Sequence, residues 1–83
     1  MKTSVNTSVM KLIIKALIKN GSVTADDCFR YGRNNEDWDG FSKRKVIDHL
    51  EVLTKSGWIV KDDKKGKDNF YNEHYYKLPL IKR

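Results

Sequence analysis

Three consecutive cations, Lys43, Arg44 and Lys45, stand where the sequence predicts the first turn of a helix. Ser42 precedes them and is a good N-cap, because its hydroxyl can accept a hydrogen bond from a backbone N–H of that turn. The N-terminal end of a helix carries partial positive charge, so acidic side chains would stabilise it and cations do not. Cations in this position favour a surface that binds an external anion.

The helix that carries these cations is predicted over residues 42–56. Its apolar residues recur at the helical period and form one stripe: Val46, Ile47, Leu50 and Leu53. Gly57 ends the helix, since glycine readily adopts the left-handed conformation that the last carbonyls need. Arg44, Lys45 and Asp48 point away from the stripe, which predicts a basic outer face on a helix that is fixed to a core.

The remaining polar residues do not have the types and spacing of a catalytic or metal site. Cys28 is the only cysteine, so the chain holds neither an internal disulfide nor a cysteine-based metal site, and no histidine is placed beside it as a base. His49 lies at the edge of the apolar stripe, where we expect half-buried packing. Residues 37–40 resemble the start of a calcium loop but lack its later ligands. We therefore expect a protein that is not an enzyme and that binds no metal or cofactor.

The charge of the chain also indicates an anionic partner. The 83 residues carry 17 Lys and Arg against 11 Asp and Glu, a net charge of +6, and such a charge bears on association rather than on fold. Residues 24–41 hold five acids and two Arg, so the rest of the chain holds fifteen of the basic residues. Clustered cations are a stronger sign of an anionic partner than the total.

The length predicts one small domain over residues 1–83 with a limited core, much of it supplied by two Trp, four Tyr and three Phe. The lone cysteine fits a reduced, cytoplasmic setting. No apolar run approaches the roughly 20 residues that span a bilayer, and lysines interrupt the nearest candidate. We therefore expect no membrane contact.

A second helix is predicted over residues 5–19, and its apolar arc is wider than one neighbouring helix usually covers. Met10, Ile14 and Ile18 extend the arc sideways at four-residue spacing. Two explanations stay open. Either other helices and a sheet cover this helix from two sides, or these three residues form a homodimer interface, because exposed apolar patches often mark partners.

A short strand and a short helix are predicted next. Ser22 and Val23 favour a strand, and Thr24 with Asp27 resembles a capping box that starts a helix over residues 25–31. Gly32 is expected to stop this helix. A polar, acidic loop then leads to the third helix, and Trp38 within it is expected to cover the core.

The end of the chain predicts an antiparallel hairpin over residues 58–78, with a short basic tail at 79–83. Three cations form the tip of this hairpin: Lys64, Lys65 and Lys67. Phe70 and Tyr71 lie near the tip. We expect them to pack along the hairpin, with contact to a partner as the alternative.

This order of helix, short helix, basic-tipped helix and hairpin resembles the winged helix-turn-helix family over nearly the whole chain. The most specific match is HLEVLTKSGWIV, in which two spaced leucines of the third helix precede Gly57 and the Trp58–Ile59 pair that opens the wing. The resemblance implies an α+β fold of three helices with a C-terminal two-stranded β-hairpin wing. It implies less about function, because winged helices also serve as protein-contact modules.

If the likeness holds, the third helix lies in the major groove of DNA, and helix-turn-helix proteins read bases mainly from the N-terminal part of that helix. The resemblance then implies that Arg44 and Lys45 contact guanine edges or phosphates. Ser42 and Lys43 would contact phosphates. Asp48 either accepts a hydrogen bond from cytosine N4 or pairs with Arg44 one helical turn away.

Cations outside this helix would extend the contact surface. The resemblance implies that Arg30 and Arg33 flank the groove from the preceding helix and loop. It also implies that Lys64, Lys65 and Lys67 of the wing meet the DNA backbone or the adjacent minor groove.

The expected function is sequence-specific binding of double-stranded DNA by a small transcriptional regulator, a repressor of a phage, plasmid or other mobile element. Such a cytoplasmic protein would associate with the nucleoid when bound to DNA, and a dimer on a two-fold site would explain the wide apolar arc. One alternative is the DNA-binding module of a replication initiator or recombination accessory factor. Another is a winged-helix module for protein–protein interaction.

Overall fold

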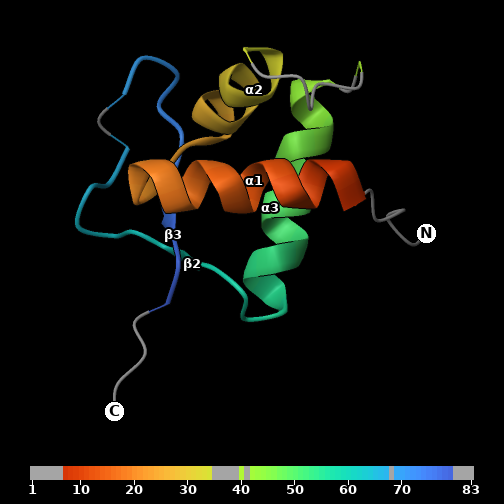
Figure 1. Ribbon diagram of the computed structural model, residues 1–83. Helices are drawn as coiled ribbons and strands as arrows, with labels where there is room; N and C mark the ends of the chain where they lie inside the picture. Colours follow the sequence, from red (N-terminus) through yellow and green to blue (C-terminus); the bar gives the residue numbers. More distant parts are fainter. Residues whose placement is uncertain (1–6, 35–39, 41, 68, 80–83) are drawn as a thin grey trace.

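The chain forms three helices and three short strands in the computed structural model, which describes residues 7–34, 40, 42–67 and 69–79. In chain order they are α1 (Thr7–Asn20), β1 (Ser22–Val23), α2 (Ala25–Arg33), α3 (Lys43–Lys55), β2 (Val60–Lys61) and β3 (Tyr76–Lys77). Figure 1 shows α1 crossing in front of α3, with the strands beside the C-terminal end of α1. Each helix contacts the other two. The helices agree with the predicted ranges to within two residues, and residues 5 and 6 lie outside the described part.

Local sequence signals set the starts of two helices as predicted. The Thr24 side chain accepts from the Asp27 N–H (3.1 Å), and the Asp27 carboxylate accepts from the Thr24 N–H (3.0 Å), which makes a capping box at the start of α2. Ser42 caps α3 by accepting from the Lys45 N–H (3.3 Å). Gly57 follows α3 with a φ of +81°, a left-handed conformation that glycine adopts without steric cost.

Gly32 does not end α2, contrary to the expectation from sequence. The helix continues to Arg33, and its C-cap is Asn34, whose N–H donates to the Arg30 carbonyl (3.0 Å). Glycine inside a helix costs only about 1 kcal/mol relative to alanine. Gly32 is also buried, and α2 runs two residues beyond its predicted end.

The strands form one antiparallel sheet in the order β1-β3-β2, and the fold is therefore a small α+β domain. Val23 of β1 pairs with Tyr76, and Val60 of β2 pairs with Lys77. The strand at Ser22 and Val23 is confirmed, and it adds a third strand to the predicted hairpin. The hairpin strands themselves are short, so residues 62–75 form a long connection that we call the β2–β3 loop.

The core lies where α1 meets α3 and the sheet. Its larger buried apolar residues are Val9, Leu12, Ile13, Leu17, Val23, Val46, Leu50, Leu53 and Ile59. His49 is buried among the core elements rather than half-buried as expected. Its Nδ1 lies 2.8 Å from the Lys45 carbonyl oxygen, and because a carbonyl only accepts, Nδ1 is the donor.

The aromatic residues contribute less to this core than their number suggests. Tyr76 is buried, but Trp58 is 68% exposed, so the expectation that the tryptophans help fill the core is wrong for Trp58. The chain bends at Trp58 and Ile59, whose backbone N–H groups both donate to the Leu53 carbonyl at the end of α3. This turn buries the Ile59 side chain fully and leaves Trp58 facing solvent. The other tryptophan, Trp38, lies outside the described residues.

Candidate nucleic-acid interface

The outward face of α3 carries charges of both signs. Arg44 and Lys45 in the first turn are exposed, as are Glu51 and Lys55 further along. The Arg44 side chain is 79% exposed, and its Nε lies 3.3 Å from Asp48 Oδ1 at i,i+4 spacing. The predicted basic outer face is therefore present at the start of α3, with an ion pair that orients Arg44 along the helix.

Lys43 pairs with carboxylates of the protein itself, although the resemblance implies that it contacts a phosphate. Its Nζ lies 3.1 Å from Glu73 Oε2 and 3.7 Å from Asp26 Oδ1, and 3.9 Å from the centroid of the Tyr71 ring. The side chain is 27% exposed. Asp26, Lys43, Tyr71 and Glu73 thus form one group, the Glu73 cluster. Arg44 and Lys45 are better placed than Lys43 for an external anion.

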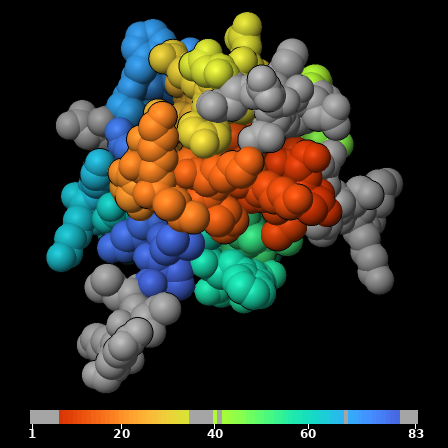
Figure 2. All heavy atoms as spheres, in the orientation of Figure 1, coloured from red at the N-terminus to blue at the C-terminus, as the bar shows by residue number. Residues whose placement is uncertain are grey.

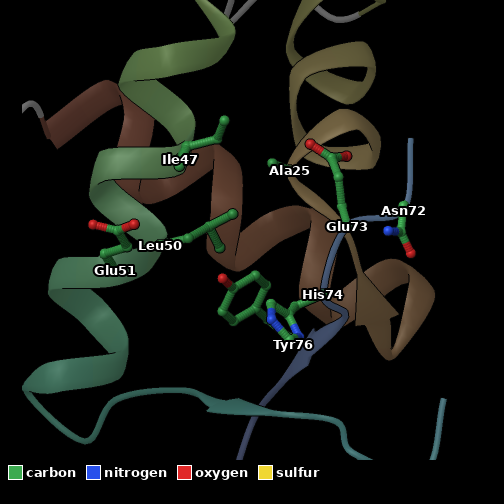
Figure 3. A pocket seen from close by; sticks show the side chains of 8 residues that line it. All are labelled: Ala25, Ile47, Leu50, Glu51, Asn72, Glu73, His74 and Tyr76. Carbon is green, nitrogen blue, oxygen red and sulfur yellow. The ribbon is translucent and has the colours of Figure 1, made fainter. Parts of the chain in front are cut away.

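Glu73 also binds the first turn of α2. Its Oε1 accepts from the Asp26 backbone N–H (3.1 Å), a residue 47 positions earlier, and Figure 3 shows its carboxylate directed to the space between α2 and α3. An anion at a helix N-terminus is stabilised by the partial positive charge there. One carboxylate therefore ties the starts of two helices to the β2–β3 loop. Sequence reasoning missed Glu73, because no local pattern marks a partner so distant in the chain.

The basic residues of α2 and of the β2–β3 loop lie on the surface. Arg30 is exposed and its Nε lies 2.9 Å from Asp26 Oδ2, while the Arg33 guanidinium lies 5.8 Å from the Phe29 ring centroid. The predicted tip cations Lys64, Lys65 and Lys67 are exposed. The predicted contacts of these cations with a DNA backbone stay a prediction, and Arg30 keeps its solvent exposure despite its ion pair.

Asp62 fixes the start of the β2–β3 loop. Its carboxylate accepts from the Ser22 hydroxyl (2.8 Å) and lies 3.7 Å from Lys77 Nζ, and its N–H donates to the Tyr75 carbonyl (2.8 Å). The hydrogen bond from Ser22 and the charge of Lys77 lower the pKa of Asp62. All three strands are therefore linked at the base of the loop that carries the tip cations.

A groove separates α3 from β3 and from the end of the β2–β3 loop (Figure 3). Its walls include Ile47, Glu51, Glu73, His74 and Tyr76. Desolvation lowers the pKa of His74, with Lys67 and Lys61 acting in the same direction. Burial raises the pKa of the Tyr76 hydroxyl, helped by the negative charges of Glu51 and Glu73. Two carboxylates in its walls make this groove a poor place for phosphate.

The apolar face of α1 is divided. Met10 and Ile14 are half-buried and pack against the core, whereas Ile18 is 71% exposed. Met10 and Ile14 also line a shallow hollow with Thr7, Lys11 and Lys15, and in Figure 2 the side chains of α1 run across the middle of the visible face. Packing against the core thus accounts for Met10 and Ile14 in the wide apolar arc of α1, whereas Ile18 is exposed to solvent.

Phe70 and Tyr71 do not pack along the hairpin together, which corrects the preferred expectation. Tyr71 lies under the Lys43 ammonium, but Phe70 is 92% exposed. Sequence alone could not separate the two, because both are aromatic and adjacent in a loop.

Burial disfavours the thiolate form of Cys28. Burial, with smaller effects from Asp27 and Glu73, raises the pKa of its thiol to about 12, and the thiolate is the reactive form. Within the described residues, no three His, Cys, Asp or Glu side chains gather as metal ligands. In the same part of the chain, no helix has the length and apolar character to cross a bilayer. The acidic residues at 36, 37 and 39 lie outside it.

Comparison with protein-family models, with curated proteins and with solved structures finds no match to this chain.

Glu73→Ala should lower the free energy of unfolding by about 1–2 kcal/mol, because it removes a hydrogen bond at a helix N-terminus together with a partly buried ion pair. Urea denaturation followed by circular dichroism measures this change. Glu51→Ala is the matched control, since it removes the same charge from an exposed position on α3 and should change stability by less than about 0.5 kcal/mol. Equal effects of the two substitutions would contradict the structural role of Glu73.

Proposed function

We propose that this protein is a winged helix-turn-helix protein that binds double-stranded DNA in a sequence-specific manner. The observation that carries the proposal is the exposed first turn of α3, where Arg44 and Lys45 point to solvent. Helix-turn-helix proteins place this part of the recognition helix against base edges in the major groove. The order of the helices and the C-terminal hairpin supports the same assignment, with the β2–β3 loop as the wing.

Each exposed polar residue at the start of α3 then has a defined role. Arg44 and Lys45 contact guanine O6 and N7 or the flanking phosphates. Asp48 holds Arg44 in place through their ion pair, or accepts from cytosine N4 once Arg44 has turned to the DNA. Ser42 uses its oxygen to cap α3, and its hydroxyl hydrogen remains able to donate to a phosphate.

The wing adds contacts that do not depend on sequence. Lys64, Lys65 and Lys67 meet the phosphates beside the recognition helix, and Arg30 and Arg33 approach the backbone from α2. Such contacts supply affinity and fix the orientation of the protein on the duplex. The net charge of +6 favours association in the same way.

The biological role we propose is that of a small cytoplasmic transcriptional regulator, a repressor of a phage, plasmid or other mobile element. A replication initiator or a recombination accessory factor would use the same DNA-binding surface. The basic charge of the chain supports all three roles equally.

A protein-interaction module is the second candidate, because one observation favours it. The outward face of α3 places Asp48 and Glu51 among its cations. Phosphates repel carboxylates, whereas a protein partner with charges of both signs could pair with all of them.

Reversing two charges in the first turn of α3 tests the DNA-binding proposal. Fluorescence anisotropy with labelled duplex DNA of mixed sequence should show affinity that falls steeply with salt, because binding releases counterions from the phosphates. The variant Arg44→Glu/Lys45→Glu should bind more weakly. Its slope of log K against log salt should become shallower by about one for each phosphate that the altered side chains no longer neutralise.

A matched pair of single variants controls for net charge in this experiment. Lys45→Glu should weaken binding much more than Lys19→Glu, which makes the same charge change on an exposed residue near the end of α1. If the two variants bind equally well, or if the unaltered protein does not bind at low salt, the proposed interface is wrong and a protein partner becomes the better candidate.

We also propose that two copies associate through the α1 face formed by Met10, Ile14 and Ile18. Exposed Ile18 supports this, because it continues the half-buried surface of the other two. Cationic Lys11 and Lys15 border this face, so association would bring like charges of the two copies closer together. Salt should therefore strengthen the dimer while it weakens DNA binding.

Ile18→Glu should convert the dimer to a monomer, as measured by sedimentation equilibrium, because it places a carboxylate in an apolar interface. Trp58→Glu is the control, since Trp58 is exposed to a similar extent at the far end of α3. A monomer for the unaltered protein, or equal masses for the two variants, would contradict association through α1.

A further inference from the structure

The β2–β3 loop presents an apolar ring to water. Phe70 is 92% exposed, the highest value among the large apolar side chains in the described part of the chain. Transfer of such a ring out of water is favourable by roughly 2 kcal/mol. An exposed ring of this kind is therefore available to a partner that can cover it.

The Phe70 ring contacts the ring of the next residue in the chain. Phe70 meets Tyr71 edge-on, with ring centroids 4.9 Å apart and planes at 90°, an arrangement that aromatic pairs favour. The centroid of the Tyr71 ring in turn lies 3.9 Å from the Lys43 ammonium in the first turn of α3. Phe70 is therefore connected to the start of the proposed recognition helix through one intervening ring.

The backbone around Phe70 is also fixed. The Asn69 side chain donates to the Glu73 carbonyl (2.6 Å) and accepts from the Glu73 N–H (2.9 Å), which closes the turn that contains Phe70. The Asn72 N–H donates to the Asn69 carbonyl (3.0 Å), and Asn72 has a φ of +54°, a conformation that asparagine tolerates better than most residues. Because the turn is closed in this way, the backbone at Phe70 loses little conformational freedom when the ring binds a partner.

The cations of the same loop favour a partner with anionic groups. The exposed cations Lys64, Lys65 and Lys67 belong to the same loop, and the Lys65 ammonium lies 4.9 Å from the centroid of the Tyr75 ring. Such a site fits a polymer that offers anionic groups and flat apolar faces together. DNA has both, in its phosphates and its bases, and apolar side chains of minor-groove proteins insert between base pairs and kink the duplex.

We infer that Phe70 inserts into a base step of the bound duplex, next to the phosphates that the wing lysines contact. This inference rests on the proposed DNA binding and adds a preference to it. Insertion must unstack a step, so the protein should prefer DNA in which one step opens at low cost, as at a mismatch or an unpaired nucleotide.

The test compares two labelled duplexes of the same sequence, one fully paired and one with a single mismatch, by fluorescence anisotropy. The unaltered protein should bind the mismatched duplex more tightly. Phe70→Ala should weaken binding to that duplex by about 5- to 100-fold, the effect expected for removal of one aromatic–base stack. Phe70→Trp should keep the preference, because it retains a stacking surface. Trp58→Ala, which removes an exposed aromatic at the other end of α3, should leave the preference unchanged.

A 2-aminopurine base placed at the mismatch gives an independent readout. Its fluorescence should change with the unaltered protein and not with Phe70→Ala, since stacking alters the environment of that base. If the protein binds DNA but Phe70→Ala binds both duplexes as the unaltered protein does, or weakens binding to both equally, base insertion is wrong and the proposed DNA binding stands. If the unaltered protein binds neither duplex, both proposals fail.

Discussion

The carboxylate of Glu73 is the interaction on which the arrangement of this surface depends. One oxygen accepts from the Asp26 N–H in the first turn of α2, and the other pairs with Lys43 at the start of α3. Because Glu73 directly precedes the segment leading to β3, the same contacts position the β2–β3 loop against both helices. A short sheet of two-residue strands could not hold so long a loop by its ladder alone. The orientation of the β2–β3 loop relative to α3 depends instead on the partly buried Glu73 carboxylate.

The Glu73 cluster also explains how the start of α3 tolerates its cations. Cations there oppose the partial positive charge of the helix end, yet each of the first two has an anionic neighbour. Lys43 pairs with Glu73 and Asp26, and Arg44 pairs with Asp48. The turn is therefore stabilised in the free protein by its own carboxylates. Arg44 stays exposed, so an external anion can compete with Asp48 for it, which is the behaviour expected of a surface that binds phosphates or guanine edges.

Much of the fold could be predicted because its signals are local. The capping box of Thr24 and Asp27, the N-cap at Ser42 and the left-handed Gly57 each depend on residues within a few positions of one another. The apolar stripe of α3 follows from the helical period alone. These features determine which helices form and which face of α3 turns outward.

The roles of single residues around this face depend on contacts between distant segments, which sequence patterns do not mark. Lys43 pairs with Glu73, whereas the next two cations of the first turn stay exposed. Of the adjacent aromatic residues, Tyr71 contacts Lys43 and Phe70 stays exposed. The prediction therefore placed exposed cations on α3 but could not assign a role to each residue around them.

The first turn of α3 and the β2–β3 loop together make up the proposed DNA-binding surface. The most direct measurement is a titration of ¹⁵N-labelled protein with a short duplex, followed by heteronuclear NMR. We expect amide signals from residues 42–45 and from the loop around residues 64–71 to shift together at one protein-to-DNA ratio. Signals at the start of α1 should stay in place. Shifts confined to α1 or to the groove beside Tyr76, with the first turn of α3 unaffected, would contradict the proposed surface.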